Sequence, residues 1–357
     1  MIEIRKLMDL AVEKEASDIH LAVGRRPVLR KGGKLLDIGE MPVLTADDTL
    51  HLIREIAPER AMAEIADSGT ADFAYAHEDK ARFRVSAFRQ REVHGMIMRL
   101  IPHRLRSFEE IGLPESVREL LVRPRGLILV TGPTGSGKST TLATMIDWIN
   151  ENRQCHIVTI EDPIEYYHQH KASMVTQREV GTDVPSFGEA MRRVLRQDPD
   201  VILLGEMRDL ETTSAAITAA ETGHLVFGTL HTTGSARTVD RIIDQYPTNQ
   251  QEQVRAQLSV SVLGVISQLL LPRADGKGLV AAFEVMILNS AIENHIRKGE
   301  TFKIPSVIQT NKRAGMVLLD DHLLSLVQSG SITPKVALET AQDPAGLEGR
   351  LLQARGG

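Results

Sequence analysis

The sequence has 357 residues, of which 42% are hydrophobic, and its formal net charge is −5 at pH 7. This length suits one large globular domain or two, and the charge gives no overall drive toward nucleic acid. The single cysteine, Cys155, excludes an intrachain disulfide and any zinc site built from paired cysteines, and it suits a reducing compartment.

The first segment, MIEIRKLMDLAVEKEASDIHL, carries charged residues every few positions. It therefore lacks the unbroken apolar core that a signal peptide or a membrane span requires, and we expect a cytoplasmic protein. Within this segment, the helical period of apolar residues predicts a helix over 4–15. An extended segment is expected at 19–23, and the next hundred residues alternate short strands with one or two helices.

Basic and apolar residues alternate strictly from Arg82 to Arg89, and Gly95–Ile101 continues as a second predicted strand. This pattern is typical of a half-buried sheet with a solvated basic face, but a basic face directed at an anion fits equally well. Pro102 and the residues up to Pro114 are predicted to form a hinge between domains.

After Pro124 the pattern changes to strands that alternate with helices, which predicts a doubly wound, mostly parallel α/β sheet. Two further strands flank a loop at 274–278 and form a predicted hairpin, and only short helices are expected from residue 289 onward. The predicted strands are 126–131, 156–160, 201–205, 225–230, 268–272 and 279–285, and the predicted helices are 138–150, 186–197 and 210–222.

The strongest motif is GPTGSGKS, which fits the pattern GxxxxGK[ST] and lies between a predicted strand and a predicted helix. Its glycines let backbone N–H groups surround phosphate oxygens, Lys138 reaches the β- and γ-phosphates, and the Ser139 hydroxyl binds magnesium. We therefore predict ATP and Mg²⁺ as cofactors. The expected nucleotide-binding residues are Gly132, Pro133, Thr134, Gly135, Ser136, Gly137, Lys138, Ser139 and Thr140.

Acidic residues follow two other strands of the predicted sheet. Glu161 and Asp162 come after one strand, and Glu206 comes after another. Ligands of open parallel sheets bind beyond the carboxyl ends of the strands, so these carboxylates should face the bound phosphates. They are candidates for holding magnesium and orienting a water molecule.

Two histidines, His224 and His231, bracket the apolar strand 225–230. An extended chain separates them by roughly 20 Å, so they cannot share one metal ion. His231 ends its strand at the phosphate edge and is expected to face the γ-phosphate as a donor. His224 lies at the far end of the strand, where packing and functional roles both remain open.

The motifs GPTGSGKST, IEDPIEY, DPDVILLGEMRD and TGHLVFGTLHT stand in this order. Together they resemble the Walker A, Asp box, Walker B and His box motifs of the secretion ATPase superfamily. The resemblance is closest to the type IV pilus retraction ATPases of the PilT/PilU family, and it covers nearly the whole chain because SDIHL and RFRVSAFRQ resemble the family's N-terminal domain.

The resemblance implies a PAS-like α+β domain (1–101), a linker (102–113), a RecA-like P-loop ATPase core (114–288) and a C-terminal helical region (289–357). It also implies that Glu206 orients the attacking water, that Glu161, Asp162 and Glu165 support metal and water, and that His231 senses the γ-phosphate. His224 stays among the catalytic candidates. Arginines of the N-terminal domain, expected at Arg84 and Arg99, would reach the nucleotide in a hexamer.

The resemblance implies a hexameric ATPase motor for pilus retraction and twitching motility. Such a motor would act at the cytoplasmic face of the inner membrane on a pilus platform protein, with a paralogous ATPase as a further partner. Extension-type ATPases generally carry a long N-terminal extension and a tetracysteine insert, and this sequence shows neither, so we expect retraction. Its AIENHIRKG segment has Glu293 and His295 where the retraction family has arginine and leucine.

Three alternatives stay open. The altered segment allows an accessory ATPase that modulates a paralogue, and the shared motifs allow a pilus assembly or secretion ATPase. A DNA-handling P-loop ATPase would use the basic strands as a nucleic-acid surface, although no nucleic acid is expected from the charge. Such a protein would bind DNA with a steep salt dependence.

Overall fold

The computed structural model describes residues 2–78, 80–101 and 105–355. The chain forms two compact units, which are described separately. The first contains Met1–Arg104 with Pro163–Tyr166, and the second contains Leu105–Asp162 with Tyr167–Gly357. Among the described residues, no helix is both long and apolar enough to cross a membrane.

The first unit is built on an antiparallel sheet with strand order β3-β2-β1-β6-β5-β4. Helices α1, α2 and α3 pack on it, and apolar side chains such as Leu7, Ile53 and Phe83 join in one core. The helices are α1 (Ile4–Glu13), α2 (Ala46–Ile56) and α3 (Glu59–Ser68), and the strands are β1 (Asp18–Leu21), β2 (Val28–Lys31), β3 (Lys34–Asp37), β4 (Thr70–His77), β5 (Ala81–Gln90) and β6 (Val93–Ile101).

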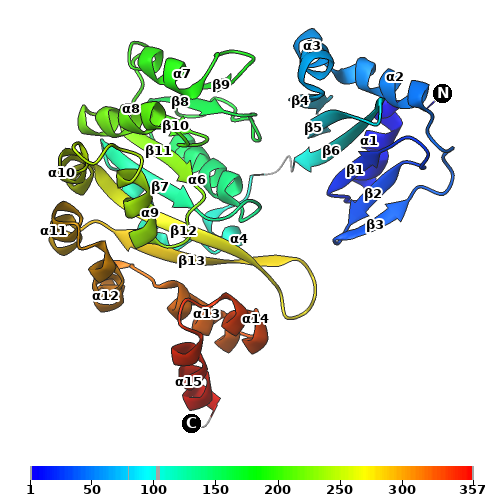
Figure 1. The fold of residues 1–357 in the computed structure, drawn as a ribbon. Helices are drawn as coiled ribbons and strands as arrows, with labels where there is room; N and C mark the ends of the chain where they lie inside the picture. Colours follow the sequence, from blue (N-terminus) through cyan, green and yellow to red (C-terminus); the bar gives the residue numbers. More distant parts are fainter. Residues whose placement is uncertain (1, 79, 102–104, 356–357) are drawn as a thin grey trace. The chain divides into compact units, whose positions relative to one another are not determined.

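The second unit contains a seven-stranded sheet in the order β13-β12-β7-β11-β10-β8-β9. All neighbouring pairs are parallel except β12 and β13, which form an antiparallel hairpin (Figure 1). The strands are β7 (Gly126–Thr131), β8 (His156–Glu161), β9 (Met174–Glu179), β10 (Val201–Leu204), β11 (Leu225–Leu230), β12 (Val262–Pro272) and β13 (Leu279–Ile287).

Both faces of the second sheet are covered by helices, because its central strands are apolar on both sides. In β7, Leu127 and Leu129 pack into one core with residues of α7 to α10, whereas Ile128 and Val130 pack into the opposite core with α6. These helices are α4 (Phe108–Ile111), α5 (Arg118–Leu121), α6 (Lys138–Asn152), α7 (Phe187–Val194), α8 (Leu210–Glu221), α9 (Ser235–Ile243) and α10 (Gln251–Ser261).

The C-terminal part is a set of short helices, as predicted. A small core joins the last three of these helices to the hairpin through Leu271 and Ala282. The helices are α11 (Ser290–Lys298), α12 (Ile304–Thr310), α13 (Leu319–Gln328), α14 (Pro334–Thr340) and α15 (Pro344–Arg355), with 3-10 turns at Glu115–Val117, Thr301–Lys303 and Lys312–Ala314.

The predicted α/β class is confirmed. The observed strands β7 and β11 have the predicted bounds, 126–131 and 225–230. Strand β9 and helices α9 and α10 were not predicted. The hairpin strands are longer than expected, because β12 begins at Val262 and β13 ends at Ile287. Residues 102–104 of the predicted linker 102–113 lie outside the described residues, and the bounds of the four predicted segments remain predictions.

Candidate nucleotide site

The phosphate-binding motif lies between β7 and α6, and its backbone requires glycine at three positions. Gly132, Gly135 and Gly137 have φ values of +143°, +79° and +88°, which side chains rarely adopt. A Cβ on Gly132 would also lie 2.2 Å from the carbonyl oxygen of Gln268, and one on Gly137 would lie 2.8 Å from the Gln268 side-chain nitrogen. The loop is therefore packed tightly against strand β12.

The same loop fits phosphate groups chemically. The first i to i−4 bond of α6 runs from the Thr141 N–H to the Gly137 carbonyl, so the preceding amides form the helix N-terminus, where anions bind well. The buried Ser136 hydroxyl has no hydrogen-bond partner among the described residues. Lys138 Nζ donates to the carbonyls of Gly132 (2.8 Å) and Pro133 (3.0 Å), which places its charge over the loop.

Magnesium at such a loop needs few protein ligands, because phosphates and waters supply most of its octahedral shell. Ser139 is the second residue of α6 and offers the hydroxyl that the motif predicts. Across the described ranges, no group of three or more His, Cys, Asp or Glu residues could hold a metal ion. The Ser139 hydroxyl therefore fits a magnesium ion that the nucleotide carries.

Glu206 and His231 lie together at the carboxyl edge of the sheet, as predicted. His231 Nε2 lies 2.8 Å from Glu206 Oε1, and the Arg208 guanidinium forms an ion pair with the same oxygen. Both of these contacts are made to Oε1 of Glu206. The carboxylate is thus held at one oxygen and can accept a proton or a hydrogen bond at the other.

A cavity of about 290 Å³ lies beside this pair, with Glu206, Arg208, His231, Thr232 and Arg241 in its wall. These residues follow β10 and β11 or belong to α9. Glu206 also holds the pKa of Arg208 above its ordinary value, with a smaller contribution from Asp162. The cavity is therefore lined by charges of both signs at the edge where parallel sheets bind ligands.

Glu161 is the last residue of β8, and Asp162 follows it in an exposed position. The Thr159 hydroxyl donates to Glu161 Oε1 at 2.6 Å, so this carboxylate is oriented by its own strand. Glu165 lies in the segment Pro163–Tyr166, which belongs to the first unit. The structure therefore brings Glu161 and Asp162 to the sheet edge, and within the first unit Glu165 lies 4.0 Å from Arg84.

His224 is not at this edge. It precedes β11, at the opposite end of the strand from His231. Its Nδ1 lies 3.0 Å from the carbonyl oxygen of Ala219, and its backbone N–H donates to the same oxygen. These contacts anchor the end of α8 and favour the packing role over the catalytic one.

Arg84 and Arg99 are directly opposed on β5 and β6. Arg99 Nε donates to Asp18 Oδ1 at 2.9 Å, and Arg30 lies 3.8 Å from the other oxygen of this buried carboxylate. Both arginines thus have a carboxylate partner within the first unit, because Arg84 lies 4.0 Å from Glu165. The reach of either arginine to a nucleotide remains a prediction.

Two features of the site were missed in the sequence. Arg208 pairs with Glu206, and its position two residues after Glu206 in GEMRD could have suggested this. Gln268 lies on β12, far from the motif in sequence, yet it accepts a hydrogen bond from the buried Thr141 hydroxyl at 2.6 Å. No local pattern indicates that contact.

The family model described as "Type II/IV secretion system protein" matches residues 1–297. The chain belongs to this family. Within the type II/IV secretion system family, it is 46% identical over 343 residues to the type IV pilus retraction ATPase PilT of Pseudomonas aeruginosa, covering 96% of this chain and 99% of PilT. It is 39% identical to the type IV pilus ATPase PilU of the same organism, covering 95% and 89%.

A solved structure shows the same fold. The crystal structure of the pilus retraction motor PilT with bound ADP matches with a TM-score of 0.90 at 46% identity, covering 98% of this chain and 99% of that one. The predicted resemblance to the retraction ATPases is therefore confirmed. The loop and the carboxylate edge described above lie in a family whose members include nucleotide-binding motors.

Proposed function

We propose that this chain is an ATP-hydrolysing motor that powers retraction of a type IV pilus and thereby twitching motility. The observation that carries the proposal is the Glu206–His231 pair, held at 2.8 Å on the sheet edge beside an intact phosphate loop, in a chain similar to PilT over nearly its whole length. The reaction is the hydrolysis of ATP to ADP and phosphate.

The proposed division of labour follows the geometry. Lys138 would bind the β- and γ-phosphates, and Ser139 would ligate Mg²⁺, which neutralises charge that develops during phosphoryl transfer. Glu206 Oε2 would accept a hydrogen bond from the attacking water, while His231 and Arg208 hold Oε1 and fix the rotamer. Glu161 and Asp162 would support the metal and its water ligands.

We propose that an arginine from another part of the assembly contacts the phosphates. Arg84 is the better candidate, because its contact with Glu165 is 4.0 Å long, whereas Arg99 donates to the buried Asp18 at 2.9 Å. An arginine delivered by a moving domain stabilises transition-state charge and couples hydrolysis to motion. This arrangement supports a homohexamer, and a monomer in sedimentation with ATP and magnesium would contradict it.

The proposed place of action is the cytoplasmic face of the inner membrane, with a pilus platform protein as partner. The test is Glu206→Gln at the native locus, followed by a count of surface pili and a motility assay. More pili with lost motility would support retraction. Cells without pili would indicate a motor for pilus assembly. An unchanged number of surface pili would argue against the motor proposal.

A second candidate function rests on helix α11. Glu293 pairs with Arg297, and His295 Nδ1 lies 3.2 Å from Glu300, so both unusual residues are engaged with neighbours on the outer side of the helix. Ile292 and Ile296 form its buried side. This altered surface favours an accessory ATPase that modulates a paralogue, and near-background hydrolysis by the purified protein alone would support that role over the motor.

A further inference from the structure

Gln177 bridges the carboxylate of Glu161 to a neighbouring loop. It lies on β9, directly across from Thr159 of β8. Its side-chain Nε2 donates to Glu161 Oε1 at 3.3 Å, and its Oε1 accepts the backbone N–H of His168 at 2.8 Å. Together with the Thr159 hydroxyl, it gives Glu161 Oε1 two donors.

The partners fix which way this amide points. A backbone N–H can only donate and a carboxylate can only accept, so the amide oxygen must face His168 and the amide nitrogen must face Glu161. A glutamate of the same shape would keep the first contact but place a negative charge against Glu161. The two partners therefore require the amide of a glutamine at position 177, because a glutamate has the same size but the wrong charge.

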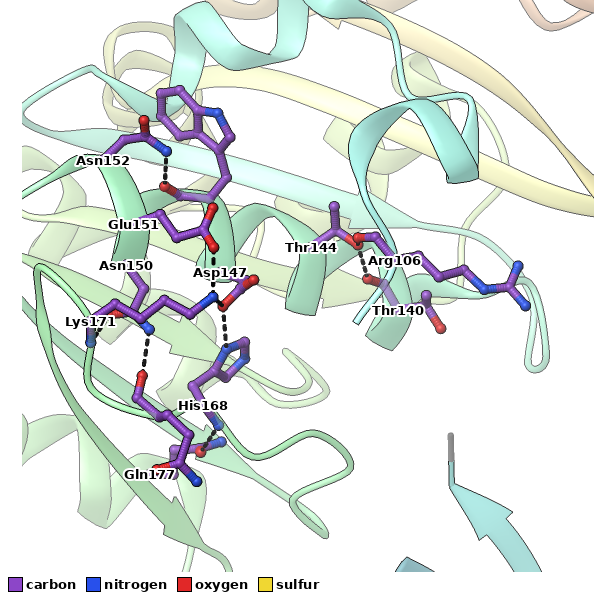
Figure 2. Close-up of polar contacts among 12 residues, drawn as sticks. Arg106, Thr140, Thr144, Asp147, Asn150, Glu151, Asn152, His168, Lys171 and Gln177 are labelled. Atoms are coloured by element: carbon purple, nitrogen blue, oxygen red, sulfur yellow. Dashed lines mark hydrogen bonds and ion pairs between the residues drawn. The ribbon is translucent and has the colours of Figure 1, made fainter. Parts of the chain in front are cut away.

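The loop of residues 168–171, whose His168 N–H binds Gln177, is attached to the phosphate-loop helix α6. The buried Asn150 donates to the Gln169 carbonyl at 2.7 Å and accepts the Lys171 N–H at 3.2 Å. Lys171 Nζ lies 2.7 Å from both Asp147 and Glu151, one turn apart on α6 (Figure 2). Three side chains of one helix face thus bind a single loop.

The His168 ring adds a further contact to the same helix. Its Nδ1 lies 3.9 Å from Asp147 Oδ1, and the side chain is nearly inaccessible to solvent (Figure 2). Burial raises the pKa of Asp147, but the nearby His168 ring and the hydrogen-bonded Lys171 ammonium together outweigh burial and lower the pKa overall. The carboxylate therefore stays charged and keeps the loop attached near neutral pH.

We propose that Gln177 is a positioning residue for hydrolysis, which sets Glu161 relative to the phosphate loop through residues 168–171 and α6. The inference rests on the proposed function, because it assigns Glu161 a role at the metal and its water. Gln177 itself does not contact the reacting atoms. A movement of α6 when phosphates bind would reach Glu161 through this chain of hydrogen bonds.

The test compares Gln177→Glu with Gln154→Glu in the full-length protein. Both variants add one negative charge near β8, but Gln154 is exposed and lies between α6 and β8, outside residues 168–171. We expect Gln177→Glu to lower kcat about 10- to 100-fold, the range for a small misplacement of a catalytic group. Binding of a fluorescent ATP analogue and the melting temperature should match those of Gln154→Glu, whose kcat should equal that of wild type.

A double-mutant cycle with Glu161→Gln separates positioning from general stability. If Gln177 acts through Glu161, Gln177→Glu should cause little further loss of kcat in the Glu161→Gln background. Full additivity, or wild-type kcat in Gln177→Glu, would overturn the inference. Absence of hydrolysis by the wild-type protein would instead refute the proposed function, so the two failures are distinguishable.

Discussion

Thr141→Val tests how strand β12 supports the phosphate loop. The Thr141 hydroxyl is fully buried and donates to Gln268 Oε1 at 2.6 Å, and Gln268 is 3% exposed. Valine keeps the shape but removes the donor, which leaves a buried amide oxygen without this partner. Such a loss costs about 1–3 kcal/mol. At about 2–4 °C per kcal/mol for a unit of this size, the melting temperature should fall by roughly 2–12 °C.

The assay is thermal unfolding followed by circular dichroism, without nucleotide, for wild type, Thr141→Val and the control Thr141→Ser. Serine keeps the hydroxyl, so it should retain most of the stability. Replacing both partners by apolar groups is nearly neutral in favourable cases, so adding Gln268→Leu should recover part of the loss. Equal melting of wild type and Thr141→Val would show that this hydrogen bond does not support the loop.

Three further predictions follow from the site and the C-terminal region. Lys138→Ala should weaken ATP binding by about 10- to 100-fold, the value of a charge-assisted contact, and equal affinity in a titration with labelled ATP would contradict the assigned role. Glu206→Gln should keep ATP bound while kcat falls about 100-fold or more, so wild-type phosphate release would remove this residue from catalysis. Burial lowers the pKa of His322, whose Nδ1 accepts the Phe283 N–H at 2.9 Å. Because the unfolded chain then binds the proton more readily, stability should fall as pH drops below about 6.5, and His322→Gln should flatten the change in melting temperature between about pH 7.5 and pH 5.5.

The strands at the centre of the second sheet could be predicted because burial on both faces demands continuous apolar runs. Gly126–Thr131 and Leu225–Leu230 are fully buried along their length. Strand β9, with the sequence MVTQRE, could not be predicted in the same way. It pairs with β8 at one edge of the sheet, and only Val175 and Glu179 are buried, so it lacks such a run.

Helix α10 was missed for a related reason. The apolar residues that it buries are Val254 and Leu258, and this narrow stripe gives little periodic signal over eleven residues. Helix α9 is different, because its buried apolar residues Val239, Ile242 and Ile243 lie on one face of a strongly amphipathic helix. Its sequence could therefore have predicted a helix.

For the site, the sequence predicted which side chains follow which strands, and parallel topology brings Glu206 and His231 to one edge. The contact between their atoms depends on rotamers and on Arg208, which no spacing rule supplies. Gln177 and Gln268 contact the site only through hydrogen bonds to residues that are distant in sequence, Glu161 and Thr141. The part of the site that lies on strand ends was therefore predictable, and the part that supports it from β9 and β12 was not.

The β12–β13 hairpin contacts three regions through adjacent residues. Gln268 supports the phosphate loop, Ser267 accepts the Gly234 N–H near the start of α9, and Glu284 accepts both the Ser235 N–H and the Gln342 side chain. Substitutions at these positions should not be independent during evolution, because a shift in the register of β12 and β13 would disturb all three regions. Among relatives, substitutions at Gln268 should therefore be accompanied by substitutions at Thr141, and the hairpin should accept insertions only in its exposed loop.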